Sequence, residues 1–266
     1  MLMTLALYLI LGALAGIVAG LFGIGGGLLI VPVLIFSFEL QGLSTAVLTH
    51  MAVATSLATI VVTSTSSILA HHKRGAVDWG LFRPMAAGLV LGAVLGVNTA
   101  VLLPGPVLQV LLGSFVLLVA VQMLFNLQPK QGAQAPKSAE LVAAGGVIGW
   151  ASSIFGIGGG TLSVPYLNWR NQAMRVAVAT SAACGLPIAM MGATTNIWVG
   201  WGREGLPEWS LGYVYLPAFL GIVLASSFTA KLGARWAHTL PQAVLKRCFA
   251  IFLFLVALRF LGSNLF

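Results

Sequence analysis

Charged residues are scarce in this chain of 266 residues, of which Asp, Glu, Lys and Arg together make up only 7%. A soluble protein needs roughly 25% charged residues to cover its surface. Hydrophobic residues supply 59% of the chain, and the mean hydropathy is +1.02. Several apolar runs exceed the ~20 residues that cross a bilayer, whereas the ~10-residue alternating segments of a transmembrane β-barrel are not seen. The sequence therefore predicts an all-α polytopic protein of the cytoplasmic membrane, surrounded by the lipid bilayer.

Acidic residues and cysteines are especially rare. Cys184 and Cys248 both lie in apolar runs, so neither a disulfide framework nor a metal site is predicted, and no cofactor is expected. The acidic residues all fall at the ends of apolar runs, which predicts no carboxylate relay at membrane depth. They are Glu39, Asp78, Glu140, Glu204 and Glu208. No Ser-His-Asp set and no helix-spaced His, Glu and Asp cluster is found at membrane depth, and this disfavours an enzyme.

Basic residues outnumber acidic ones and give a net charge of +8. Most Lys and Arg residues lie between apolar runs, where they set the orientation of a membrane protein, so the charge does not indicate a nucleic-acid partner. The apolar runs predict membrane segments with ends uncertain by a few residues. The predicted segments are Met3–Phe22, Leu28–Phe38, Leu43–Ala70, Trp79–Leu103, Val107–Leu127, Ala139–Phe155, Thr161–Leu167, Ala173–Trp201, Leu211–Leu232 and Ala243–Phe260.

The chain repeats itself on either side of a polar stretch, QPKQGAQAPKS, at residues 128–138. FGIGGGLLIVP begins at Phe22 and FGIGGGTLSVP at Phe155, and MAVATS from Met51 matches VAVATS from Val176. A third pair of similar segments closes each half in the same order. We therefore predict two homologous transmembrane repeats, residues 1–127 and 139–266, joined by a linker at 128–138.

The distribution of Lys and Arg favours an inverted repeat. Four full spans in each half would divide the basic residues almost equally between the two sides of the membrane. If each GIGGG segment is instead a broken hairpin that enters and leaves on one side, all 13 Lys and Arg residues except Arg203 and Arg259 share one side. The positive-inside rule prefers this second arrangement. Each half is then expected to hold a Gly-broken helix or hairpin plus three transmembrane helices.

The two glycine triplets are candidates for a substrate site. Non-helical backbone at membrane depth must be buried in protein or line a cavity, and Gly-rich breaks at matching places in inverted halves point to a transporter's binding site. A helix that restarts after a break presents free N–H groups and its positive dipole end, so a small anionic substrate is expected there. The candidate residues are Gly25, Gly26, Gly27, Gly158, Gly159 and Gly160. The alternative is that the triplets serve close helix packing, the reading we prefer for Gly12, Gly16 and Gly20.

Hydroxyl side chains in the repeated segments extend the candidate site. Thr55 and Ser56, with Thr180 and Ser181, lie inside apolar runs where they would donate hydrogen bonds to an anion. The alternative is that these hydroxyls bond to the carbonyl one helical turn back. The second repeat alone has Thr161 and Ser163, where the first has Leu28 and Ile30, so the two halves of the site are chemically unequal.

These motifs resemble the TauE/SafE sulfite exporter family. The resemblance rests on the duplicated FGIGGGxLxVP, the AVATS after each copy, RGAVDW from Arg74 and LPQAVLKR from Leu240, and it spans both halves. It implies a secondary transporter, an exporter of sulfite or of an organosulfonate such as sulfoacetate. A passive anion channel on the same frame stays open as the alternative. The sequence leaves the coupling ion undecided and does not distinguish a monomer from a homodimer.

Overall fold

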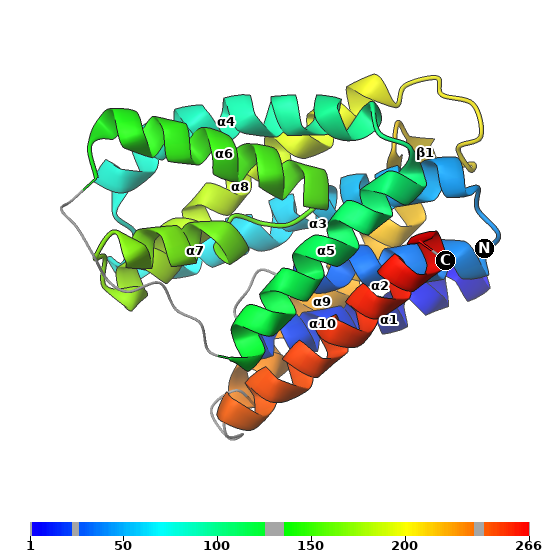
Figure 1. The fold of residues 1–266 in the computed structure, drawn as a ribbon. Coiled ribbons are helices and arrows are strands. Elements are labelled where there is room, and N and C mark those ends of the chain that lie inside the picture. Colours follow the sequence, from blue (N-terminus) through cyan, green and yellow to red (C-terminus); the bar gives the residue numbers. More distant parts are fainter. Residues whose placement is uncertain (1, 23–26, 126–135, 237–241, 266) are drawn as a thin grey trace.

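The chain folds almost entirely into helices. The computed structural model describes residues 2–22, 27–125, 136–236 and 242–265, which form helices and one two-stranded antiparallel hairpin (Figure 1). In chain order these elements are α1 (Leu2–Phe22), α2 (Gly27–Leu40), α3 (Thr45–Lys73), α4 (Trp79–Val101), α5 (Gly105–Leu124), α6 (Ser138–Phe155), α7 (Gly160–Trp169), α8 (Met174–Val199), β1 (Ser210–Leu211), β2 (Val214–Tyr215), α9 (Leu216–Trp236) and α10 (Gln242–Leu265).

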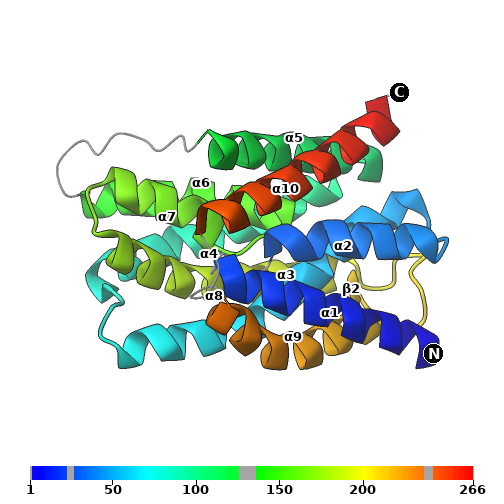
Figure 2. The same cartoon turned by 90° about the horizontal axis from the view of Figure 1, so that it is seen from below.

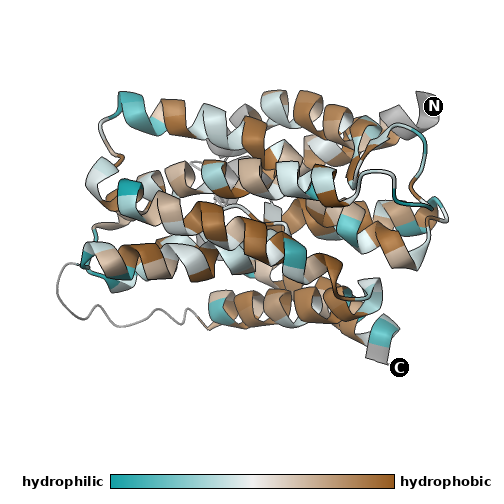
Figure 3. Cartoon of the chain, turned by 90° about the horizontal axis from the view of Figure 1, so that it is seen from above, coloured by the Kyte–Doolittle hydropathy of each residue, from teal (hydrophilic) through white to brown (hydrophobic). Residues whose placement is uncertain are grey.

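The protein is an all-α polytopic membrane protein. Among the described residues, six helices are long and apolar enough to cross a bilayer, namely α3, α4, α5, α6, α8 and the part of α10 from Lys246 to Asn264. Hydrophobic residues cover the lengths of the helices, while most of the hydrophilic residues lie near their ends and in the connections (Figure 3). This distribution matches helices that pass through an apolar slab and turn at its polar boundaries.

The apolar runs of the sequence predict the helices to within a few residues, with one difference. The segment predicted as Leu211–Leu232 begins as the β1–β2 hairpin, and α9 starts only at Leu216. Gly212 lies in the hairpin with φ +54°, a conformation that ends regular helix and that glycine adopts without strain. Pro217, in the first turn of α9, suits a helix start because its missing N–H would have no intrahelical partner. Apolar composition alone did not reveal this turn.

Helices from the two halves pack against each other in pairs. The central α3 and α8 lie side by side and are the most buried of the membrane-spanning helices. Around them α1 packs along α9, α4 packs along α6, and α5 packs along α10. Every one of these pairs joins one half to the other, so the two halves form a single intertwined bundle.

Small residues permit the closest of these contacts. On α4, a Cβ at Gly92 would lie 2.1 Å from the carbonyl oxygen of Gly146 in α6. Between α1 and α9, a Cβ at either Gly12 or Gly16 would lie 2.6 Å from a backbone Cα of α9. The packing role expected for Gly12 and Gly16 is therefore confirmed, whereas the contacts of Gly20 are not among those that the structure describes. Close backbone approach of this kind is how helices associate in membranes.

Matching helices of the two halves run in opposite directions. In Figure 1, α3 runs from right to left and α8 from left to right, and the same reversal relates α4 to α9 and α5 to α10. The view from below agrees (Figure 2). Helices α1 and α2 likewise run in opposite directions and diverge toward the right of Figure 1, whereas α6 and α7 diverge toward the left.

Candidate functional site

A break of four residues, 156–159, separates α6 from α7, and we call it the second break. Gly156 ends α6 in the left-handed region with φ +65°, and the N–H of Ile157 donates to the carbonyl oxygen of Ser152 over 2.9 Å. Helix α7 restarts at Gly160, and the N–H of Ser163 reaches back to the carbonyl of Gly159 over 2.8 Å. This is a glycine helix stop followed directly by a new helix start. The prediction of a broken helix is confirmed here.

The second break is wedged between α3 and α8. A Cβ on Gly156 would lie 2.9 Å from the Cα of Val53 in α3, and one on Gly159 would lie 2.9 Å from the backbone N of Gly185 in α8. Both distances are shorter than real Cβ contacts, so these positions require glycine. The Ser56 hydroxyl of α3 donates to the Gly156 carbonyl over 2.7 Å and fixes the break in place.

The glycine triplet of the first repeat approaches the second break. Gly25 and Gly26 lie outside the described residues, whereas Gly27 is the first residue of α2. A Cβ on Gly27 would lie 3.0 Å from the Cα of Ile157 and 3.1 Å from the carbonyl oxygen of Gly156. The start of α2 and the second break therefore touch at the centre of the bundle, where α3 and α8 also meet.

Free hydrogen-bond donors gather around the start of α7. Within the described residues, no acceptor is found for the backbone N–H groups from Gly158 to Leu162. The buried hydroxyl oxygens of Thr161, Ser163 and Ser181 also have no partner there. Unsatisfied N–H groups and the positive end of the helix dipole favour a negative ligand. The arrangement can hold an anion without a buried cation.

The Thr-Ser motifs of the two halves are used differently. Ser56 is committed to the Gly156 carbonyl, while Ser181 is fully buried with its hydroxyl unpartnered among the described residues. Thr55 accepts a hydrogen bond from the N–H of Tyr215 over 3.0 Å, and Thr180 accepts one from the N–H of Asp78 over 3.0 Å. A role for these hydroxyls in contacting substrate stays a prediction, and Ser181 is the one of the four whose hydroxyl has no hydrogen-bond partner among the described residues.

Sequence reasoning missed one hydroxyl and one repeated loop. Ser152 precedes the second break, is fully buried, and carries a hydroxyl with no partner in the described chain. The loop before α4, Gly75-Ala76-Val77-Asp78, is matched by Gly212-Tyr213-Val214-Tyr215 before α9. The shared Gly-x-Val spacing, at the same place in each half, is the signal that would have revealed this second pair.

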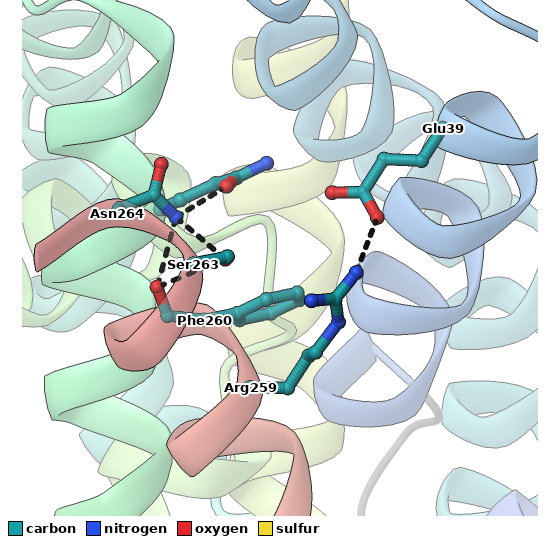
Figure 4. A network of polar contacts seen from close by, with 6 residues as sticks. Glu39, Arg259, Phe260, Ser263 and Asn264 are labelled. Atoms are coloured by element: carbon teal, nitrogen blue, oxygen red, sulfur yellow. Dashed lines mark hydrogen bonds and ion pairs between the residues drawn. The ribbon is translucent and has the colours of Figure 1, made fainter. Parts of the chain in front are cut away.

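Charged side chains lie away from the second break. Glu140 at the start of α6 pairs with Arg170 at the end of α7, which ties together the two feet of that hairpin. At the opposite end of the bundle, Glu39 of α2 lies 3.9 Å from Arg259 of α10 (Figure 4). In the same region of α10, the Asn264 amide donates to Gln109 of α5 over 2.7 Å. All five acidic residues sit at helix ends or in connections, as the sequence predicts.

Comparisons with known proteins agree on one family. A family model described as Sulfite exporter TauE/SafE matches residues 8–260. A probable membrane transporter protein of Haemophilus influenzae is 40% identical over 253 residues, covering 95% of this chain and 96% of that protein. One of Methanocaldococcus jannaschii is 30% identical over 88% of this chain and 86% of its own. Another, YunE of Bacillus subtilis, is 26% identical and covers 99% and 100%. No solved structure matches the chain.

Proposed function

The chain belongs to the TauE/SafE sulfite exporter family, and from this premise we propose that it exports a small sulfur oxyanion, sulfite or an organosulfonate such as sulfoacetate. As a member of that family it is a multi-pass membrane transporter rather than an enzyme. The observation that carries the finer proposal is the set of free donors at the start of α7. Five consecutive N–H groups, from Gly158 to Leu162, have no acceptor within the described chain.

A tetrahedral or pyramidal oxyanion suits these donors. Its several oxygens need several hydrogen bonds at once, which the N–H groups and the hydroxyls of Thr161, Ser163 and Ser181 would supply. Hydrogen bonds to charged groups are stronger than those between neutral ones, particularly where water is excluded. The glycines let the break approach its neighbours closely, since a Cβ at Gly159 would lie only 2.9 Å from the backbone N of Gly185.

Transport would follow from two halves of opposite orientation. The opposed directions of α3 and α8, α4 and α9, and α5 and α10 support an inverted repeat with halves at 1–127 and 139–266. The described Lys and Arg residues other than Arg203 and Arg259 belong to the end of the bundle where α3 finishes and α8 starts. The positive-inside rule makes that end cytoplasmic. Rearrangement of the halves around the second break would then expose it to either side in turn.

The first experiment combines ligand binding with flux. Purified protein is screened by thermal unfolding against sulfite, sulfoacetate and simple carboxylates, because a ligand at 100 times its dissociation constant stabilises the folded state by about 2.7 kcal/mol. Flux of the best ligand is then measured in proteoliposomes. The double variant Thr161→Val with Ser163→Ala should lose most of the ligand-induced stabilisation and of the flux.

Ser114→Ala is the matched control, because Ser114 is exposed on α5 and its hydroxyl bonds only to the Val110 carbonyl among the described residues. Its ligand response should equal that of the wild type. An unchanged ligand response in the double variant would show that the substrate does not bind at the start of α7. Stabilisation by carboxylates alone would show that the substrate is not a sulfur oxyanion.

A passive anion channel is the second candidate, favoured by one observation. Every acidic residue lies at a helix end or in a connection, so the membrane-depth carboxylates common in proton-coupled carriers are not provided. Planar-bilayer recording distinguishes the two, since a channel gives unitary currents that persist without a pH gradient. A carrier gives flux without resolvable unitary events.

A further inference from the structure

The two Gly-x-Val loops are built alike at opposite ends of the bundle. Gly75 and Gly212 have φ values of +62° and +54°, so each loop turns at a left-handed glycine. The first loop joins α3 to α4 at the left of Figure 1, and the second joins α8 to α9 at the right. With the Lys-rich and Arg-rich end in the cytoplasm, the loop at 75–78 faces inward and the loop at 212–215 faces outward.

Each loop ends on the same kind of hydrogen bond. The last residue of the inner loop, Asp78, donates its N–H to Thr180 of α8, and the last residue of the outer loop, Tyr215, donates its N–H to Thr55 of α3, both over 3.0 Å. Each bond therefore crosses from one half of the chain to the other. Both threonines occupy the same position of the repeated AVATS motif.

These two bonds stand directly beside the candidate site. Thr180 precedes Ser181, the fully buried serine with a free hydroxyl, and Thr55 precedes Ser56, which holds the Gly156 carbonyl over 2.7 Å. One loop thus closes over the Thr-Ser pair of α8 from the cytoplasmic end, and the other closes over the pair of α3 from the outer end. Both bonds are formed in this structure, and Cys184, one turn beyond Ser181, is fully buried.

We propose that the loops at 75–78 and 212–215 are the inner and outer gates of the transport path, with Thr180 and Thr55 as the positioning residues that latch them. The proposal rests on the proposed transport function for its purpose. A single neutral hydrogen bond between each loop and the opposite half is strong enough to hold a loop and weak enough to release it. Opening one latch while the other stays closed would connect the second break to one side of the membrane only.

The two latches are not equally secured. In the outer loop, the Tyr213 ring is buried and stacks on His50 with centroids 5.5 Å apart, and the Tyr213 N–H lies 3.4 Å from the Asn196 carbonyl. The inner loop has the small Ala76 at the corresponding position. The exposed Arg175 adds to the inner loop only a long hydrogen bond, from its side chain to the Arg74 carbonyl over 3.5 Å. We therefore expect the inner latch to open more readily than the outer one.

Cys184 provides a built-in reporter for the test. In a Cys248→Ser background it is the single cysteine of the chain. Labelling by the membrane-impermeant cationic thiol reagent 2-(trimethylammonium)ethyl methanethiosulfonate, which is not an anion of the proposed substrate class, is measured from the cytoplasmic side in inverted vesicles and from the outer side in right-side-out vesicles. Thr180→Val should raise the labelling rate from the cytoplasmic side on the order of two- to tenfold, as loss of one hydrogen bond predicts. Thr55→Val should raise it from the outer side by less.

The conservative variants Thr180→Ser and Thr55→Ser keep the acceptor oxygen and should restore wild-type rates. Arg175→Ala, at an exposed residue, tests the inner loop without touching the core and should raise cytoplasmic labelling alone. Unchanged rates in the threonine variants, or an equal rise from both sides, would overturn the proposal. The labelling measurement needs no substrate, so it tests the gating proposal independently of which anion is transported.

Discussion

Helices α2 and α7 are encoded by copies of one motif, yet they present different chemistry at the centre of the bundle. At the second and fourth residues of the helix, α2 carries Leu28 and Ile30, both buried, whereas α7 carries Thr161 and Ser163 with unpartnered hydroxyls. The glycine at each helix start is retained, as are the prolines five residues later. The two copies therefore share the glycine and the proline of the helix, while the described polar donors of the motif belong to the second copy.

This inequality is informative about the substrate. In the site that we propose, one wall would donate hydrogen bonds and the other would be apolar, which would favour an anion with one polar and one hydrocarbon face. Ser56 and Ser181 differ in the same way. The Ser56 hydroxyl bonds to the Gly156 backbone, whereas the Ser181 hydroxyl has no partner among the described residues. In our proposal the first half would thus supply a framework for the site, and the second half would supply the hydrogen-bond donors.

The largest expected effect comes from the left-handed glycine that ends α6. Gly156→Val places a β-branched side chain at φ +65° and 2.9 Å from the Val53 Cα, so we expect a destabilisation of several kcal/mol, about 1–3 from the backbone alone. Thermal unfolding in detergent measures it. Gly158→Ala is the control, since among the described residues its Cβ meets only Ile60, at an ordinary 3.6 Å, and the melting temperature should change little. Equal loss in both variants would mean that the whole break, rather than Gly156, sets the stability.

An intermediate effect separates the two serines of the AVATS motifs. Ser181→Ala should weaken substrate binding on the order of tenfold with little change in melting temperature, because hydrogen bonds to charged groups contribute about 1.5–3 kcal/mol. Ser56→Ala should instead lower stability by about 1 kcal/mol and leave binding nearly intact, since it loses the bond to the Gly156 carbonyl. Paired KM and unfolding measurements decide between them. The reverse pattern would place the substrate on the first half.

Sequence patterns predicted the helices because bilayer thickness imposes a length and a composition that can be read locally. Residues 211–215 were wrongly predicted as the start of a helix, because an apolar hairpin and an apolar helix start have the same composition. The glycine break was predictable for a similar reason, since repeated GIGGG segments stand out in any apolar run.

The partners of the threonines were not predictable from the sequence. Thr55 and Tyr215, like Thr180 and Asp78, are brought together only by the packing of one half against the other. Local patterns carry no information on such contacts across more than 100 residues. For the same reason the sequence did not predict the hydrogen bond from Ser56 to the Gly156 carbonyl. This bond distinguishes Ser56 from Ser181, although both serines occur in the same motif.

The smallest effects are expected from the two ion pairs of the described residues, of which one lies within the second half and the other joins the two halves. The Arg170 side chain is only 12% exposed and joins the two ends of the α6–α7 hairpin, but its partner Glu140 is 39% exposed, so Arg170→Ala should lower stability by about 0.5–1 kcal/mol. The Arg259 side chain is 62% exposed and lies 3.9 Å from Glu39, so Glu39→Gln should change stability by less than about 0.5 kcal/mol. Chemical denaturation at low and high salt checks both. Since exposed charges are screened, only the small Glu39 effect should vanish at high salt, and a salt-sensitive Arg170 effect would show that its burial does not protect the pair.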